Sequence, residues 1–479
     1  MNVPPTALLG MILFTGTLLA PGLGGAEGDG ESREDLERHV RELDQKLKAL
    51  EARLELEKGA GAEQAKGPSG SKAEQPAGGN AREAAGAEEK SKGPRSIFEL
   101  PEWIKNIKLV NDFRARYDGI YAPDSDFVTR NRARFRLRLG AIITIQDDFN
   151  VGVRLASAPS TGGDSGGDPV STNATLENDA SRKPVGIDWA FVKWSPIHTE
   201  RLKGSFTFGK MENPPNYSEM IFDVDYTPEG LSEQFSYEMN RNHALNGYFG
   251  QYAIDELQFS ARDPYLFLEQ LRLDSILTDR ITTSIGGSGL IIVNASSLTT
   301  ASVPDSNHGN TRDATGALVN KYHLAIADAG LTYNLDRFPL YQGRFPIKVS
   351  GEYIHNFGAD DSNIAYAFGP TFGRSGKKGN WEVSYRYQEL QADANYEELT
   401  ASDYGAFYRG RPAGEPATLR VPTFLNGTNI RGHIFKLSYS PFDSLTIYGN
   451  VWLTEAINEV PRDDPIKGVR VIIDAVWRF

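Results

Sequence analysis

Hydrophobic and polar residues alternate one by one over much of the chain beyond residue 96, most clearly in TRNRARFRLRLGAIITI at 129 to 145. A helix of about 3.6 residues per turn would scatter the arginines of this stretch around its axis, so the pattern predicts a strand. At period 2 one face of this strand is apolar and the other cationic. The apolar face holds Ala133, Phe135, Leu137, Leu139, Ala141, Ile143 and Ile145, and the cationic face holds Arg130, Arg132, Arg134, Arg136 and Arg138.

The segment 108 to 118 alternates in the same way, with Arg114 and Arg116 on its polar face, and is the natural hairpin partner of the arginine strand. With the further segments below, the pattern predicts roughly 16 strands, within the range of membrane barrels. The segment 257 to 261 is the weakest, and it is needed to make the strand number even. The further segments are 149–157, 187–194, 204–211, 246–254, 257–261, 265–277, 281–293, 322–335, 345–357, 364–372, 381–392, 430–440, 445–455 and 467–479.

The connections alternate in length as well. Short turns at 146–148, 278–279, 379–380 and 442–444 take turns with long polar loops at 158–186, 212–243, 294–320 and 393–429. Outer-membrane barrels have this asymmetry between their two ends. We therefore expect an all-β, antiparallel transmembrane barrel whose apolar faces meet lipid and whose arginines line a polar lumen. The alternative for a single strand is a soluble sandwich with its arginines in bulk water. The glycines in GGSGL at 286–290 favour a bulge or bend.

Aromatic residues support the membrane interpretation. The last strand places Trp477 and the C-terminal Phe479 on its apolar face, which resembles the terminal strand that the barrel-assembly machinery recognises in bacterial outer-membrane barrels. Five tryptophans near predicted strand ends are typical of the aromatic girdles at a membrane interface: Trp189, Trp194, Trp381, Trp452 and Trp477.

The N-terminal part divides into three segments before the predicted barrel at 96–479. Residues 1–26 have the apolar run and small-residue end of a secretory signal peptide, with a non-cleaved anchor helix as the alternative. Residues 27–58 carry a heptad seam that predicts a short coiled coil, with a lone amphipathic helix as the alternative. Residues 59–95 have the composition of a disordered linker. The seam residues expected to support oligomerisation are Leu36, Val40, Leu43, Leu47, Leu50 and Leu54.

Composition narrows the function classes. The chain has 479 residues, a net charge of −12, a mean hydropathy of −0.42 and no cysteine. This is too polar for a bundle of membrane helices, and the acidic balance argues against a nucleic-acid partner. Absence of cysteine excludes disulfides and thiolate metal sites. The seven histidines are dispersed without metal-ligand spacing, and no nucleophile motif is present, so we expect neither a metal, a cofactor nor an enzymatic activity.

A family resemblance follows from three stretches: LPEWIKNIKLVNDFRARYDG, TRNRARFRLRLG and FGKMENPPNYSEMIFDVDYTPEG. The chain resembles bacterial outer-membrane porins, single-chain barrels preceded by a signal and often by a short coiled coil. The resemblance extends over about 96–479, is strongest in these stretches and at the C-terminus, and is weak between about 290 and 430. It implies a pore for small hydrophilic solutes, with no solute specificity carried over.

By this resemblance, loop 212–243 is the third outer loop, which in general porins folds into the lumen. Its acids would then face the arginine strand and create a transverse field that sorts solutes by charge and dipole, whereas the arginine ladder itself would favour anions. In the alternative, the acids lie on a solvated rim and the arginines pair with carboxylates of adjacent strands. The candidate constriction residues are Glu219, Asp223, Asp225 and Glu229, and Glu233 lies in the same loop.

The sequence thus predicts an outer-membrane diffusion porin with its coiled coil in the periplasm, forming a homo-oligomer, with a trimer favoured. Its expected partners are outer-membrane lipid and lipopolysaccharide, the barrel-assembly machinery and, through the coiled coil, the cell wall. The alternative function is a structural anchor, a closed barrel tethered to the cell wall through the coiled coil.

Overall fold

The structure is a computed structural model that describes residues 101, 103–121, 129–158, 168–303, 307–405, 407–408, 424–458 and 467–479. These residues lie within one compact unit, Arg95–Phe479. The predicted signal at 1–26, coiled coil at 27–58 and linker at 59–95 fall outside the described residues.

The described chain is built almost wholly of strands, and none of its helices is long and apolar enough to cross a membrane. Sixteen long strands form one sheet: β2 (Asp112–Tyr121), β3 (Arg130–Ile145), β4 (Phe149–Ser157), β6 (Val185–His198), β7 (Leu202–Lys210), β8 (Glu229–Asn240), β9 (His243–Ala253), β10 (Tyr265–Ile276), β11 (Ile281–Val293), β12 (Tyr322–Leu335), β13 (Phe345–Asn356), β14 (Ile364–Gly373), β15 (Trp381–Leu390), β18 (Ile430–Phe442), β19 (Leu445–Ala456) and β20 (Lys467–Arg478). The short elements are β1 (Ile104–Leu109), β5 (Ala174–Thr175), β16 (Phe407–Tyr408), β17 (Phe424–Leu425) and two 3₁₀ turns, η1 (Ala295–Ser297) and η2 (Glu397–Leu399).

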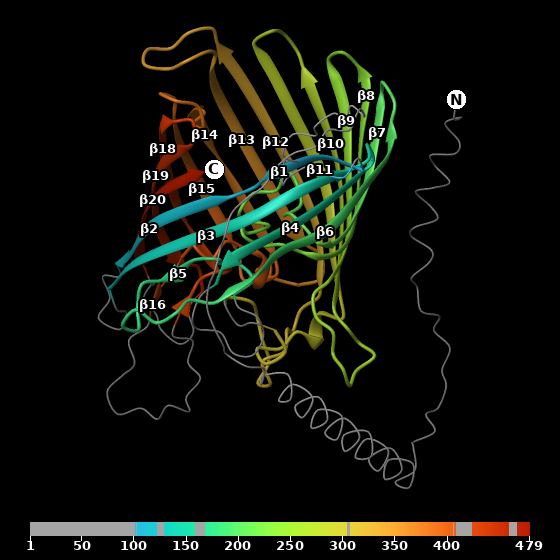
Figure 1. The fold of residues 1–479 in the computed structure, drawn as a ribbon. Helices are drawn as coiled ribbons and strands as arrows, with labels where there is room; N and C mark the ends of the chain where they lie inside the picture. Colours follow the sequence, from blue (N-terminus) through green and yellow to red (C-terminus); the bar gives the residue numbers. More distant parts are fainter. Residues whose placement is uncertain are drawn as a thin grey trace, which may run out of the picture. The chain divides into compact units, whose positions relative to one another are not determined.

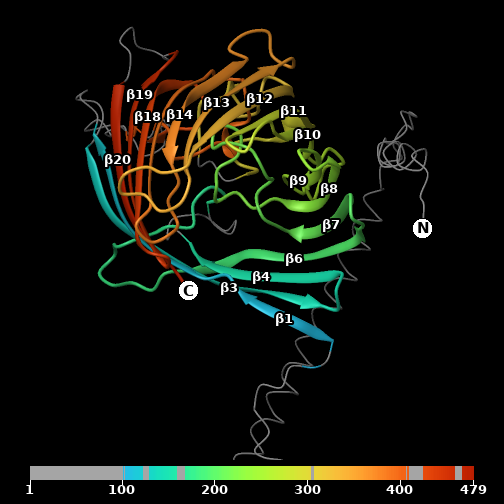
Figure 2. The same ribbon diagram turned by 90° about the horizontal axis from the view of Figure 1, so that it is seen from above.

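Each long strand pairs antiparallel with the next, and β20 pairs back with β2, so the sheet closes into a barrel (Figures 1 and 2). Phe113 faces Trp477 across this closing seam. The strand β3 is long enough to pair with β2 along its first half and with β1 along its second half. The predicted all-β antiparallel barrel of about 16 strands is therefore confirmed.

Two strand assignments from the sequence were wrong, and they cancel in the count. The segment 257–261 lies in the connection between β9 and β10, whereas β8 lies inside the predicted loop 212–243. The loop between β7 and β8 therefore spans only 211–228. The alternation of β8 is interrupted by Glu233, which falls on the same face as Leu231 and Phe235 and hides the strand pattern. The expected bulge at 286–290 is also absent, because β11 pairs with both neighbours without a register shift.

The two faces of the sheet differ as the alternation predicted. Leu139 is 47% exposed on the outer face, whereas the adjacent Arg138 is 7% exposed inside the barrel. Trp194 and Trp477 lie outside, but Trp189 and Trp452 are buried and are not girdle residues. For Trp189 the cause is a register shift opposite Arg154 and Leu155. The strand β6 carries one extra residue there, which turns both Asp188 and Trp189 inward.

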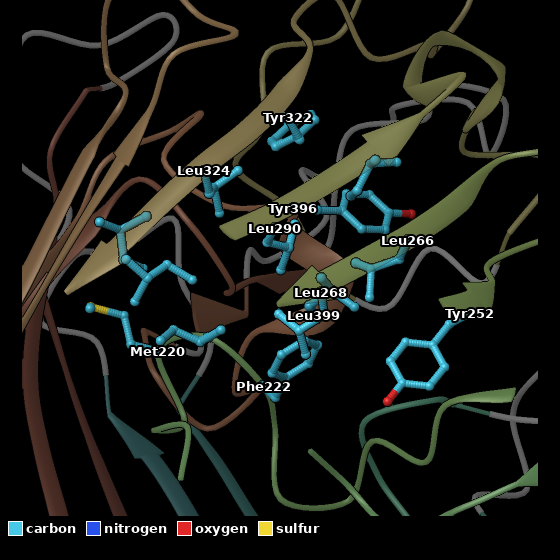
Figure 3. Close-up of a cluster of buried hydrophobic side chains, with 14 of the residues drawn as sticks. Met220, Phe222, Tyr252, Leu266, Leu268, Leu290, Tyr322, Leu324, Tyr396 and Leu399 are labelled. Atoms are coloured by element: carbon cyan, nitrogen blue, oxygen red, sulfur yellow. The ribbon is translucent and has the colours of Figure 1, made fainter. Parts of the chain in front are cut away.

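Part of the barrel interior is filled by apolar side chains from inward-folded connections. Met220 and Phe222 of the β7–β8 loop pack with Tyr396 and Leu399 of the β15–β18 connection, 391–429. Figure 3 shows these side chains gathered against residues on the inner faces of β9 to β12. Burying apolar side chains from both loops on a common surface holds the loops inside the barrel. The strand residues labelled in Figure 3 are Tyr252, Leu266, Leu268, Leu290, Tyr322 and Leu324.

Candidate functional site

The arginines of β3 lie inside the barrel beside carboxylates of neighbouring strands. Asp118 of β2 accepts a hydrogen bond from Arg132 Nη2 at 2.5 Å, and its Oδ2 lies 3.7 Å from Arg134 Nη1. Arg136 donates to Asp112 at 2.9 and 2.6 Å. These pairs follow from the strand register, which places Asp118 opposite Arg132. Wall carboxylates therefore offset part of the arginine charge, as the alternative interpretation of the sequence expected.

The β7–β8 loop adds a carboxylate to the same arginines. Asp225 Oδ1 lies 3.1 Å from Arg136 Nη1 and 2.8 Å from Arg138 Nη2. All three side chains are nearly inaccessible to solvent. The structure thus brings the acidic end of this loop against the inner arginine face of β3, a contact between residues 87 and 89 positions apart in the chain.

The β15–β18 connection supplies a second carboxylate to the wall. Asp403 Oδ1 lies 2.9 Å from Arg470 Nη2 of β20, and its Oδ2 lies 3.5 Å from Arg116 Nη1 of β2. Arg470 also donates to Asp118 at 3.0 and 3.1 Å. Two loop carboxylates, Asp225 and Asp403, therefore contact adjacent parts of one cationic wall.

The first half of the β7–β8 loop contacts other strands of the barrel wall, β13, β15 and β18. Lys436 Nζ of β18 lies 2.6 Å from Glu219 Oε2. Ser218 donates to Glu352 of β13 and accepts from Arg386 Nη2 of β15 at 3.1 Å. Together with the Asp225 contacts, these bonds carry the loop across the barrel interior from β13, β15 and β18 to β3.

The backbone of this loop is clamped by the β15–β18 connection. The amide of Asp223 donates to the carbonyl of Leu399 at 2.7 Å, and the amide of Ala401 donates to the carbonyl of Glu219 at 2.9 Å. Asn395 Nδ2 donates to the carbonyl of Ile221 at 3.1 Å. These three hydrogen bonds restrain residues 219–223 along their length. If the segment moved, the backbone groups that make the bonds would lose their partners.

The β11–β12 connection, 294–321, supports the clamp in turn. Arg312 Nη2 lies 2.5 Å from Glu397 Oε1, and Asn310 donates to the carbonyls of Ala392 and Asn395 at 2.6 and 2.8 Å. Three connections therefore form one hydrogen-bonded assembly inside the barrel.

Two carboxyls in the β7–β8 loop have oppositely shifted pKa values. Burial alone would raise the pKa of Asp225, but the guanidinium groups of Arg138 and Arg136 outweigh it and hold the pKa well below its usual range. Burial, together with the nearby Asp225 carboxylate, raises the pKa of Asp223 well above its usual range. Asp225 is thus the ionised partner of the arginines, and Asp223 is the carboxyl that resists ionisation.

Two polar cavities flank the β7–β8 loop. The first, about 250 Å³, is called the β2 cavity; Arg114 and Arg116 of β2 line it, with Asp225 and Asp403 from the loops. The second, about 550 Å³, is called the β13 cavity; Lys348 of β13 lines it, with hydroxyl groups of β11 to β15. Glu219 and Lys436 line both cavities.

The remaining candidate residues lie as follows. Arg130 begins β3 and is half-buried. Glu229 begins β8 instead of belonging to the loop; its side chain is exposed and pairs with Lys210 of β7 at 2.9 Å, away from the arginines. Glu233 lies within β8 as well. In the described part of the chain, no group of three or more His, Cys, Asp or Glu is arranged to hold a metal ion.

Sequence reasoning named Asp225 but did not single out the other carboxylates that pair with the arginines. A signal existed for Asp112, Asp118 and Asp474, because alternation places each on the same face as an arginine of its own strand. No local signal marks Asp403 or Lys436, whose roles depend on contacts with residues more than 60 positions away.

A closed antiparallel barrel, apolar outside and charged inside with loops folded into it, is the architecture of a transmembrane β-barrel of the outer-membrane type. Residues 126–289 match the model of a family described as "Putative porin". The match agrees with the porin resemblance over about a third of the chain. No curated protein matches the chain.

Solved structures similar to this chain include outer-membrane proteins of low identity. OprB of Pseudomonas putida is 10% identical, with a TM-score of 0.46, over 78% of this chain and 94% of that chain. OmpT of Vibrio cholerae, as a loop L8 deletion mutant, is 10% identical, with a TM-score of 0.41, over 78% and 99%. A mutant of the Rh. blastica porin is 8% identical, with a TM-score of 0.38, over 78% and 100%. The barrel architecture of this chain follows from its own strand pairings.

Proposed function

We propose that this protein is a passive diffusion channel for small hydrophilic solutes, narrowed by the β7–β8 loop and by the β15–β18 connection. The observation that carries the proposal is the bridge from Asp225 to Arg136 and Arg138, which holds an acidic loop against a cationic wall inside the barrel. Such an arrangement sorts solutes by charge and dipole at close range.

The charges around the β2 cavity argue for a weak ion preference instead of a strong anion preference. Its described lining residues include five cationic and seven acidic side chains. Because both signs lie close together around this cavity, we expect dipolar solutes to be favoured over ions of either sign. The cationic residues are Arg114, Arg116, Arg136, Lys436 and Arg478, and the acidic ones are Asp112, Glu219, Asp223, Asp225, Glu382, Asp403 and Asp474.

Single-channel recording in planar bilayers tests the function directly. The purified protein is expected to give discrete open levels in salt solution, and liposomes containing it are expected to swell in small sugars. A barrel that inserts but gives neither result would be closed, which would support the alternative of a structural anchor. Shortening 216–225 is expected to raise conductance, whereas shortening the β9–β10 connection at 257–262 is expected to leave it unchanged.

We further propose a homo-oligomer, a trimer being favoured, assisted by the heptad seam from Leu36 to Leu54 in the periplasm. Outward apolar side chains such as Phe208, 70% exposed, suit contact with lipid, and exposed Phe479 suits recognition by the barrel-assembly machinery. Crosslinking of the full chain and of a variant lacking 27–95 tests the oligomer. An unchanged crosslinked species in the deletion variant would assign the heptad seam to another role, such as contact with the cell wall.

A further inference from the structure

Glu219 and Lys436 stand between the two polar cavities. Both side chains line the β2 cavity and the β13 cavity, and their ion pair of 2.6 Å runs from the β7–β8 loop to β18. Val224 also lines both cavities, so a solute that passes from one cavity to the other along this boundary passes beside the pair.

The two ends of the β7–β8 loop are held differently. Asp225 contacts two arginines, and its side chain is 6% exposed. The Lys436 and Glu219 side chains are 32% and 35% exposed. Glu219 also interacts electrostatically with Arg386, and Lys436 with Glu382. A partly exposed ion pair of this kind is weak, because water competes for both charges and both long side chains lose rotamer freedom when they pair. The Glu219 contact can therefore open while the Asp225 contact stays closed.

The backbone around Glu219 does not have to move when this pair opens. The Glu219 carbonyl accepts from the Ala401 amide, and the preceding Ser218 is bonded to Glu352 and Arg386. Opening thus requires only rotation of the Glu219 and Lys436 side chains about their own bonds.

We infer that the Glu219–Lys436 pair is a side-chain partition between the two cavities, which small zwitterionic solutes open by pairing with both residues at once. The ammonium group of the solute pairs with Glu219 in place of Lys436, and the carboxylate of the solute pairs with Lys436 in place of Glu219. Neither residue therefore loses a partner as the solute passes. An uncharged solute offers no such exchange. This inference rests on the proposed channel function and adds the class of solute and the residues that select it.

The partition is tested by measuring the single-channel conductance of two variants, one that removes the negative charge and one that removes the positive charge of the pair. Glu219→Gln and Lys436→Met each break the pair, so both are expected to raise conductance although they change the lumen charge in opposite directions. The charge-swapped double variant, Glu219→Lys with Lys436→Glu, restores a pair and is expected to return conductance toward that of the wild type. Lys348→Met is the matched control, because Lys348 lines the β13 cavity but not the junction, and its conductance is expected not to rise.

Liposome swelling tests the solute class. The ratio of the glycine rate to the rate of an uncharged solute of similar size is expected to fall in both single variants and to recover in the swapped variant. A wild-type protein that fails to conduct would overturn the channel function itself. A conducting wild type whose two single variants move conductance in opposite directions, or leave it and the swelling ratio unchanged, would overturn the partition alone.

Discussion

Arg272 of β10 and Asp328 of β12 form an ion pair of 2.5 Å across the strand that separates them. The intervening residue in the register is Gly286 of β11, which lies opposite both. A Cβ atom at Gly286 would overlap the Asp328 carboxylate and crowd the Arg272 guanidinium. Since Arg272 also donates to the carbonyl of Asn216, this glycine indirectly supports the start of the β7–β8 loop.

The first prediction follows from that geometry. Gly286→Ala should displace the carboxylate from Arg272 and destabilise the barrel by about 1–3 kcal/mol, as overpacking does. Gly287→Ala is the matched control, because a Cβ there meets nothing within 4 Å. Urea unfolding in lipid vesicles, followed by tryptophan fluorescence, measures both. Equal stability of the two variants would contradict the assigned role of Gly286.

A second prediction concerns the seam where the barrel closes. Arg116 of β2 donates from Nε and Nη2 to Asp474 of β20, at 2.8 Å each. Asp474→Ala removes both of these hydrogen bonds from the buried guanidinium and leaves its 3.5 Å contact to Asp403, so it should cost about 3 kcal/mol. Glu238→Ala, which removes the partner of exposed Lys203, should have no measurable effect. The same unfolding measurement compares the two, and a stable Asp474→Ala barrel would show that β2 and β20 close without this pair.

The third prediction separates the two carboxyls of the loop. Asp225→Asn removes an ionised group from Arg136 and Arg138, so reversal potentials in a salt gradient should shift toward anions and conductance should rise. Asp223→Asn should change both much less, because its raised pKa favours the uncharged carboxyl. A larger effect from Asp223→Asn than from Asp225→Asn would reverse the assigned charge states.

The fourth prediction concerns pH. The pKa of Asp225 is lowered, so its stabilising contribution is present above the usual carboxyl pKa and is lost only as pH falls through the lower folded value. The pKa of Asp223 is raised, so its contribution is complete at low pH and is lost as pH rises through the higher folded value. The free energy of unfolding should therefore be larger at mildly acidic pH than at mildly alkaline pH. This difference should shrink in Asp223→Asn, and an undiminished difference would assign it to another group.

Period-2 alternation by itself determined the fold class and the sorting of apolar and charged faces, whereas the strand number agreed because one false strand and one missed strand cancelled. This worked because a strand exposes successive side chains to opposite environments, so lipid and lumen each leave a local record in the sequence. The arginines of β3 were found for this reason. The prediction was wrong where alternation is interrupted. Glu233 hid the strand β8, and the extra residue beside Trp189 in β6 turned that side chain inward.

The loop residues that contact the charged wall were decided by the tertiary structure. Asp225, Asp403 and Lys436 lie in segments whose local sequence carries no sign of what they face. Their contacts depend on how three long connections fold back into the barrel and bury Met220, Phe222, Tyr396 and Leu399 together. A loop has no regular alternation of apolar and polar residues from which its contacts could be predicted. The wall residue that a charged loop side chain contacts depends on how the rest of the loop packs inside the barrel. The cationic face and part of its neutralisation were therefore predictable from the chain, whereas the particular arginines that Asp225 and Asp403 contact, and the pair dividing the two cavities, were not.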